Sequence, residues 1–205
     1  LREARVAFLI RPSMAHVFTQ WGIWRAGGVA VPLCVEHPLP EIAYVIDDSQ
    51  ASVIVADREF EPSLLPLAES RGLRFALVDE LKSATVAKLP VVHASRRAML
   101  IYTSGTTSKP KGTVSTHAMI AAQIKSLVKA WEWTQEDHLL HVLPLHHLHG
   151  IINALACSLW AGATCELLPR FNADQAWSRF VANDGLTLFM AVPTIYSRLT
   201  KTWEN

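Results

Sequence analysis

The chain has 205 residues, half of them hydrophobic, and a formal net charge of +1. This length is enough to bury a substantial core in one or two lobes. A near-neutral charge lacks the basic excess of nucleic-acid-binding domains, so we expect no nucleic-acid partner. Because the sequence starts at Leu1 without Met and stops in a helical pattern, we expect an internal piece of a longer protein, with N-terminal targeting left open.

Strands and helices are predicted to alternate along the first part of the chain. Short apolar runs indicate buried strands. Ser13 can cap the first helix, and the glycine pair at residues 27–28 can end it. Strands are predicted at residues 5–10, 29–33, 52–56, 74–78, 98–102 and 112–116. Helices are predicted at residues 14–26, 41–48, 62–70 and 117–131. The segment at residues 79–97 is polar and is expected to be irregular.

The same alternation restarts after a polar segment at residues 131–136. Strands are predicted at residues 139–143, 164–168 and 186–192. Helices are predicted at residues 151–160, from a cap at Asn172 to residue 181, and from about Pro193 onward. Repeated βα units predict an α/β fold, with largely parallel sheets flanked by helices. We expect two lobes, at residues 1–131 and 132–205.

Residues 139–165 contain no Asp, Glu, Lys or Arg, a composition that raises the question of a membrane span. The stretch is interrupted by Pro144, Asn153 and four histidines. A spanning helix needs roughly 20 mostly apolar residues in succession. We therefore expect no membrane insertion, and predict a buried strand, a loop and a core helix instead.

The three cysteines, Cys34, Cys157 and Cys165, show neither a CxxC pair nor an even count. This pattern predicts no disulfide framework and no zinc site, and it suits a reducing compartment. Each cysteine has apolar sequence neighbours, so we expect small core residues.

A polar loop follows the apolar strand predicted at residues 98–102. It reads YTSGTTSKPKG over residues 102–112 and combines hydroxyl side chains, a glycine and two lysines. Gly105 allows close approach, successive backbone N–H groups can form an anion-binding nest, and hydroxyls and ammonium groups can donate to phosphate. The candidate phosphate-binding residues are Thr103, Ser104, Gly105, Thr106, Thr107, Ser108, Lys109, Lys111 and Gly112.

The position of this loop favours ligand binding, because ligands bind at strand ends in open α/β sheets. The spacing differs from the Walker A pattern, which needs a glycine five places after the first and then Lys and Ser/Thr. Here Pro110 and Lys111–Gly112 stand at those places. A solvated Ser/Thr-rich turn that ends in a basic pair is the alternative interpretation.

Five of the nine histidines fall within residues 138–149. A zinc site is one interpretation, but no carboxylate or thiolate lies at ligand spacing, so no metal site is predicted. His138 and His141 are expected at a strand end and in the core. His117, after the polar loop, is expected to be structural, with nucleotide contact as the alternative.

Four segments resemble, in the same order, the adenylate-forming family of acyl-CoA synthetases, peptide-synthetase adenylation domains and luciferases. The loop at residues 102–112 is similar to the family's YTSGTTxxPKG signature, although Ser108 stands where the family usually has glycine. Residues 144–150 are similar to its P-x-x-H-x-x-G loop, with His147 at the histidine position. Residues 25–33 and 191–196 resemble two further family elements.

The resemblance implies the two α/β lobes of the N-terminal domain of an adenylate-forming enzyme. Such enzymes activate a carboxylic acid with ATP and Mg²⁺ through an acyl-adenylate, release pyrophosphate and form a thioester with coenzyme A. In the family, a histidine such as His147 lines the carboxylate and adenylate site. The family's C-terminal domain, with its catalytic lysine, and its aromatic–Gly–x–Thr–Glu motif lie outside this sequence. We therefore expect the fragment alone to be inactive and its partner to be the missing C-terminal domain.

The acid is predicted from the histidine loop. Three imidazoles, His146, His147 and His149, suit a small acid with a second carboxylate, and the run HVLPLHHLHG resembles malonyl-CoA synthetases. Malonate or methylmalonate is therefore the expected substrate. In the alternative interpretation, His146 and His149 only pack or bond the backbone. Two other functions stay open: an adenylation domain that loads a carrier protein, and a non-catalytic nucleotide-binding relative. The expected location is the cytoplasm, or alternatively the mitochondrial matrix.

Overall fold

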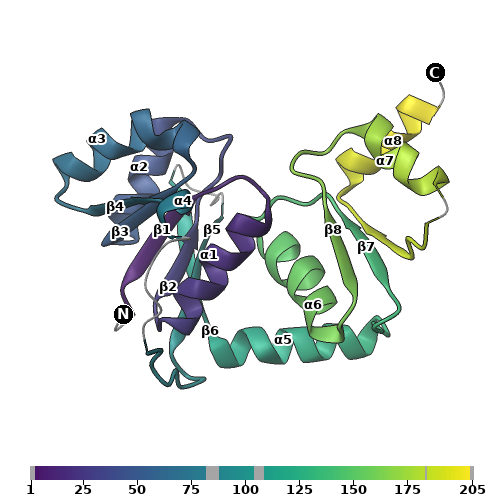
Figure 1. Cartoon of the computed structure of the whole chain (residues 1–205), viewed down its shortest axis with the longest axis horizontal. Coiled ribbons are helices and arrows are strands. Elements are labelled where there is room, and N and C mark those ends of the chain that lie inside the picture. Colours follow the sequence, from purple (N-terminus) through teal and green to yellow (C-terminus); the bar gives the residue numbers. More distant parts are fainter. Residues whose placement is uncertain (1–2, 82–87, 104–108, 183, 204–205) are drawn as a thin grey trace. The chain divides into compact units, whose positions relative to one another are not determined.

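The computed structural model describes residues 3–81, 88–103, 109–182 and 184–203. It forms two compact units, residues 1–120 and 121–205, and helix α5 (His117–Ala130) crosses the division between them (Figure 1). Both units combine strands with helices, which confirms the predicted α/β class. The functional division into lobes after residue 131 stays a prediction.

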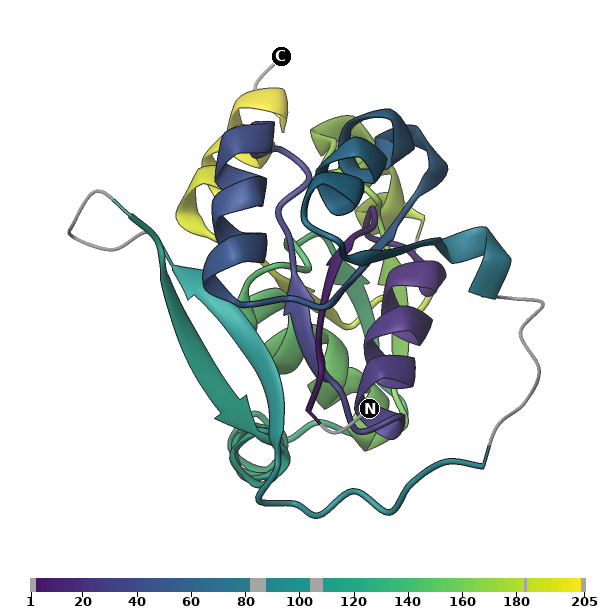
Figure 2. The same ribbon diagram turned by 90° about the vertical axis from the view of Figure 1, so that its left-hand side faces the viewer.

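The first unit is built on one six-stranded sheet with the order β4-β3-β1-β2-β5-β6 (Figure 2). Its strands are β1 (Arg5–Leu9), β2 (Val29–Pro32), β3 (Val53–Ala56), β4 (Arg74–Leu77), β5 (Arg97–Thr103) and β6 (Lys111–Thr116). All neighbouring pairs are parallel except β5 and β6, which form an antiparallel hairpin at one edge. Strands β1, β2 and β3 are almost fully buried, as their uninterrupted apolar runs predict.

Helices cover both faces of this sheet, and the period of two along β1 explains which residues they meet. Ala7 and Leu9 belong to a buried cluster with residues of α2 (Leu39–Asp48) and α3 (Glu61–Ser70). Phe8, between them, points to the other face, where its ring lies 4.9 Å from the ring of His16 in α1 (Met14–Arg25).

The predicted limits of α1 are confirmed by its capping contacts. The Ser13 hydroxyl accepts the His16 N–H at 3.4 Å, and Gly27 takes the left-handed conformation just past the helix, at φ 75°. One expectation is wrong: α4 (Val78–Leu81) begins where irregular backbone was predicted. The Glu80 carboxylate accepts the Leu77 N–H at 3.2 Å and so supplies a partner for a free amide at the start of this turn.

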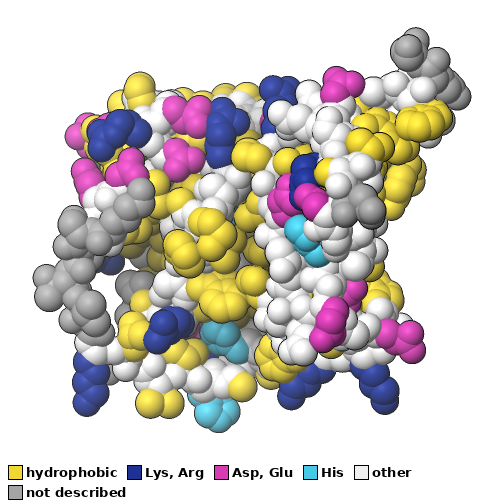
Figure 3. All heavy atoms as spheres, turned by 45° about the vertical axis from the view of Figure 1, so that its right-hand side comes forward, with side chains coloured by type: hydrophobic (Ala, Val, Ile, Leu, Met, Phe, Trp, Pro, Cys, Tyr) yellow, Lys and Arg dark blue, Asp and Glu magenta, His cyan; other side chains and the backbone are white. Residues whose placement is uncertain are grey.

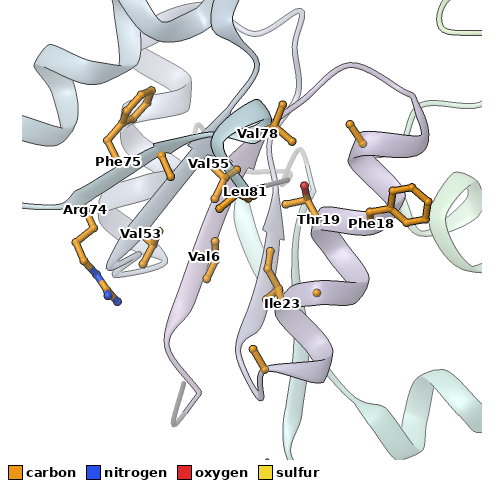
Figure 4. A pocket seen from close by; sticks show the side chains of 14 residues that line it. Val6, Phe18, Thr19, Ile23, Val53, Val55, Arg74, Phe75, Val78 and Leu81 are labelled. Atoms are coloured by element: carbon orange, nitrogen blue, oxygen red, sulfur yellow. The ribbon is translucent and has the colours of Figure 1, made fainter. Parts of the chain in front are cut away.

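An apolar groove of about 690 Å³ lies between α1 and the face of β1, β3 and β4 (Figure 4). Of the described residues that line it, Thr19 and Arg74 alone have polar side chains. The strand order separates β3 and β4 from the β5–β6 hairpin at the opposite edge of the sheet. The groove therefore lacks both the position and the chemistry of a polyphosphate site.

The second unit has a three-stranded parallel sheet with the order β8-β7-β9. Its strands are β7 (His138–His141), β8 (Thr164–Leu167) and β9 (Leu188–Met190). The helix predicted at residues 151–160 forms, but its first part is a π-helix, His149–Ala156, which continues into α6 (Cys157–Ala161). The remaining helices are α7 (Ala173–Val181), capped as predicted by Asn172, and α8 (Pro193–Trp203).

Hydrophobic side chains gather around the end of α8 on the surface of this unit (Figure 3). Tyr196 and Trp203 of α8 are both exposed. Among the helices of the described segments, none combines the length and the apolar composition that a membrane crossing requires. The sequence-based expectation of a strand, loop and core helix at residues 139–165 is confirmed.

The three cysteines are free thiols, and Cys34 and Cys157 are buried as predicted, while Cys165 is half-buried. Burial raises the pKa of each thiol to about 11. At neutral pH these residues therefore behave as small apolar groups rather than as nucleophiles.

Candidate functional site

The loop proposed to hold phosphate is carried by the β5–β6 hairpin. At the end of the hairpin Thr103 pairs with Lys111, and Tyr102 pairs with Gly112. Thr103, Lys109, Lys111 and Gly112 are exposed there. The structure therefore brings four of the nine candidate residues together at one end of the edge hairpin. The other five, Ser104, Gly105, Thr106, Thr107 and Ser108, lie outside the described residues.

Helix α2 contacts strand β5 and the two residues just before strand β6, through side chains that sequence reasoning missed. The Tyr102 hydroxyl donates to the Asp48 carboxylate at 2.6 Å. The Tyr44 hydroxyl donates to the Pro110 carbonyl at 3.1 Å, and the Lys109 ammonium lies 5.5 Å from the centre of the Tyr44 ring. The only sequence signal for these contacts is Asp48 itself, an acidic residue at the negative C-terminal end of a helix.

The electrostatics of the hairpin follow from these partners. Burial is the main cause that raises the pKa of Tyr102, and the hydrogen bond to Asp48 adds to it. Tyr102 therefore stays a proton donor at neutral pH. Lys109 and Lys111 supply two exposed positive charges, the kind of group that polyphosphate binding requires.

The histidine loop of the second unit follows β7 and turns back on itself. An added Cβ at Gly150 would lie 2.2 Å from the Pro144 carbonyl oxygen, so only glycine fits where the chain returns. The Pro144 oxygen also accepts the His147 N–H at 3.5 Å. The ends of the P-x-x-H-x-x-G pattern are thus in contact, which gives the spacing of this pattern a steric reason.

His141 supports the loop from inside the unit. Its side chain is 1% exposed, and its Nε2 atom lies 2.9 Å from the Gly150 carbonyl oxygen. Burial is the main cause that lowers the pKa of His141, so the imidazole is neutral at neutral pH and Nε2–H donates to that carbonyl. The prediction of a core histidine is confirmed.

The other histidines of the run lie in two places, on the loop itself and beside Glu166. His147 and His149 are exposed and His146 is half-buried, and the rings of His146 and His147 lie 4.1 Å apart. His138 lies 3.3 Å from Glu166, which also accepts two hydrogen bonds from Arg179. His138 therefore lies beside the structural ion pair of Glu166 and Arg179.

His117 takes the structural role that was expected. It begins α5, its N–H donates to the Arg96 carbonyl at 3.1 Å, and its ring lies edge-on to Trp24 with centroids 6.2 Å apart. Burial is the main cause that lowers its pKa. These contacts fix the helix start beside β5.

Comparison with known proteins assigns this chain to a family. Residues 1–204 match the family described as AMP-binding enzyme. The chain therefore belongs to the AMP-binding enzyme family, as its four sequence segments predicted.

Three relatives show which members it is similar to. The mitochondrial malonate–CoA ligase ACSF3 of Homo sapiens is 45% identical over 100% of this chain, which covers 37% of that protein. ATP-bound MatB from Rhodopseudomonas palustris has a TM-score of 0.87 and 30% identity over 96% of this chain and 40% of its own. A malonyl-CoA ligase with methylmalonyl-CoA and AMP bound has a TM-score of 0.84 and 32% identity over 98% of this chain and 42% of its own. The chain thus spans well under half the length of these relatives.

Proposed function

We propose that this chain is part of an AMP-forming ligase that joins malonate to coenzyme A. The observation that carries the proposal is the 45% identity to a malonate–CoA ligase over the whole of this chain. In the proposed reaction the acid's carboxylate attacks the α-phosphorus of ATP, pyrophosphate leaves, and the thiol of coenzyme A then displaces AMP. Methylmalonate is a second candidate acid, because a similar ligase structure holds methylmalonyl-CoA.

The hairpin residues are proposed to hold the β- and γ-phosphates. Both reactants are anions, so the reaction depends on charge stabilisation and positioning. Lys109 and Lys111 fit this task, being cationic and exposed beside the hydroxyl of Thr103. We extend the same role to residues 104–108 and to Gly112. Mg²⁺, when bound, neutralises phosphate charge, and we assign no residue of this chain as its ligand.

The histidine loop is proposed to bind the acid. His147 would donate a hydrogen bond to the reacting carboxylate or to the α-phosphate. His146 and His149 would face the second carboxylate, which distinguishes malonate from acetate. Imidazoles suit this task because both ring nitrogens can donate when protonated.

The test is acid-dependent ATP–pyrophosphate exchange by the full-length enzyme, screened over malonate, methylmalonate, acetate and longer acids. We expect the highest kcat/KM with malonate or methylmalonate, and a coenzyme A thioester when coenzyme A is added. Exchange with none of the acids would sink the ligase proposal. Acyl transfer to a carrier protein but not to coenzyme A would favour the alternative adenylation domain, and ATP binding without exchange would favour a non-catalytic relative.

Two variants separate the histidine roles. His147→Ala should lower kcat/KM for malonate by about 10² to 10³, the size of effect found when one transition-state donor is removed. His149→Ala should raise KM for malonate by roughly tenfold and leave KM for acetate nearly unchanged, since one charge-assisted hydrogen bond is lost. His93→Ala, in the first unit, is the control. Unchanged preference for malonate over acetate would remove His149 from the specificity role.

Two further proposals concern the whole protein. Because the chain covers 37% of its ligase relative, we propose that the remaining sequence supplies the C-terminal domain and that residues 1–205 alone do not complete the reaction. We also propose a mitochondrial rather than cytoplasmic location, since the similar ligase is described as mitochondrial. Imaging the full-length protein against a matrix marker tests the second proposal, and diffuse cytoplasmic signal would contradict it.

A further inference from the structure

The contacts of α2 with the β5–β6 hairpin give Tyr44, Asp48 and Tyr102 a common task. We refer to these three residues as the hairpin clasp. Figure 2 shows α2 beside the hairpin. One clasp residue is on the incoming strand, β5, and two are on the helix, so the group joins the hairpin to α2.

The position of Asp48 at the end of α2 calls for a physical explanation. It is the last residue of α2, and a carboxylate at this negative end of a helix is unfavourable. Its neighbour Asp47 is accounted for by a two-bond ion pair with Arg71, at 2.6 Å and 2.8 Å. Asp48 instead accepts from Tyr102 at 2.6 Å, and the Tyr44 hydroxyl lies 3.4 Å from its other oxygen. Its shortest hydrogen bond therefore comes from the hairpin residue Tyr102, while Tyr44 is a neighbour on the same helix.

Tyr44 contacts the two residues that lead into the returning strand, β6, in two ways. A phenol has one proton, and of its two acceptors the Pro110 carbonyl, at 3.1 Å, is nearer than Asp48. The ring of the same side chain lies under the Lys109 ammonium, at a distance that gives a cation–π attraction. Tyr44 thus holds the Pro110 carbonyl and the Lys109 ammonium, which belong to two successive residues of the motif.

Tyr102 completes the clasp on the other strand. Its ring covers Gly112, the residue opposite it in the register, and an added Cβ there would lie 3.0 Å from Tyr102 Cζ. An aromatic ring across from a glycine on an edge strand is a known way to stabilise such a pair. The last glycine of the motif therefore has a steric reason in this fold, independent of phosphate.

From this geometry we propose that the hairpin clasp positions Lys109 for the polyphosphate of ATP, with Tyr44 as the positioning residue that contacts the lysine. This inference rests on the proposed role of the hairpin in ATP binding. Without the clasp, the Lys109 ammonium group is still present, but its side chain no longer has a fixed orientation. Its removal should therefore weaken ATP binding and leave binding of the acid unchanged.

The experiment compares Tyr44→Phe, Tyr44→Leu, Asp48→Asn and Tyr102→Phe in the full-length enzyme. Tyr44→Phe keeps the ring and removes one hydrogen bond, so KM for ATP should rise about 2- to 10-fold. Tyr44→Leu also removes the ring, so it should raise KM for ATP further than Tyr44→Phe does. KM for malonate should stay within about twofold, because acid binding does not involve the lost bond. Asp47→Asn is the matched control: it removes the neighbouring ion pair at the same helix end and should leave KM for ATP unchanged.

A second measurement separates positioning from general destabilisation. In a Lys109→Met background, Tyr44→Leu should add little further loss of ATP affinity if Tyr44 acts through the lysine. ATP binding by titration calorimetry gives this result without turnover. Additive losses, a parallel rise in KM for malonate, or ATP affinity unchanged in all four clasp variants would each overturn the proposal. If the wild type binds ATP but shows no acid-dependent exchange, the ligase proposal fails while the calorimetric comparison still decides the clasp.

Discussion

The β5–β6 hairpin and the histidine loop both carry candidate site residues, and they are held in opposite ways. The hairpin lies at a sheet edge and is held from outside, by phenol and carboxylate groups of a neighbouring helix. The histidine loop is held from inside, by a buried imidazole and by direct backbone contact between Gly150 and Pro144. A single exposed hydrogen bond contributes little to stability. A buried donor or a close backbone contact, in contrast, cannot move without disturbing the packing around it. The hairpin can therefore adjust its conformation, whereas the histidine loop is restricted to one conformation.

The largest expected effect comes from Gly150→Ala. The new Cβ would lie 2.2 Å from a backbone oxygen that cannot move without shifting the loop, so we expect a loss of roughly 3 kcal/mol or more of unfolding free energy. Urea unfolding of the full-length protein measures it. Gly22→Ala, at a helical position with no atom within 4 Å of an added Cβ, should leave stability within about 1 kcal/mol. Equal effects at the two glycines would contradict the backbone contact.

The next effect concerns acid sensitivity through His141. Its pKa is lowered in the folded state, so the unfolded chain binds the proton more tightly and stability falls as pH drops below about 6.5. This one group contributes a slope of up to about 1.4 kcal/mol per pH unit. His141→Gln should cost roughly 2 kcal/mol near neutral pH but lose that slope. Thermal unfolding measured at several pH values tests this, and an unchanged slope in the variant would assign the acid sensitivity to other groups, such as His117.

A smaller effect is expected on the hairpin. Gly112→Ala would bring a Cβ 3.0 Å from the Tyr102 ring, which can turn aside, so the cost should be about 1 to 2 kcal/mol. Gly112→Ala should cost less stability in a Tyr102→Leu background, because the side chain that the new Cβ contacts is then smaller. A double-mutant cycle on unfolding free energy measures the coupling. Independent, additive costs would show that the ring does not constrain Gly112.

The smallest effect is expected at the bond between α5 and the π-helix. The Gln123 amide donates to the Asn153 side chain at 2.6 Å in a half-buried position. Gln123→Ala should cost about 1 kcal/mol, the usual net value of one hydrogen bond. The thermal midpoint of the full-length protein measures it. A loss as large as that of Gly150→Ala would mean that the histidine loop depends on this outer contact as well as on its inner one.

Much of the fold could be predicted because the deciding interactions are local. Continuous apolar runs gave β1, β2 and β3, and the capping residues Ser13 and Asn172 accept the backbone N–H groups expected of them. The π-helix could not be predicted in the same way. Its apolar residues are buried around most of the helix, so their order in the sequence is compatible with either helical pitch.

The candidate site divides along the same line. Motif spacing located Lys109, Lys111 and the loop histidines, because the chemistry is carried by neighbours in sequence. Tyr44 and Pro110 are 66 residues apart, and their contact exists only once β5 and β6 have paired beside α2. No local pattern carries that information. The unbalanced charge of Asp48 at a helix end was the one available signal.

The hairpin clasp also has an optical consequence. The sequence contains three tyrosines, and two of them, Tyr44 and Tyr102, belong to the clasp. Burial raises the pKa of both phenols, so each ionises at a higher pH than a free tyrosine does. Because phenolate and phenol absorb differently, an alkaline titration of wild type against Tyr102→Phe turns this contact into a built-in spectroscopic reporter. Through that absorbance difference, a loosened hairpin can be detected before any substrate is added.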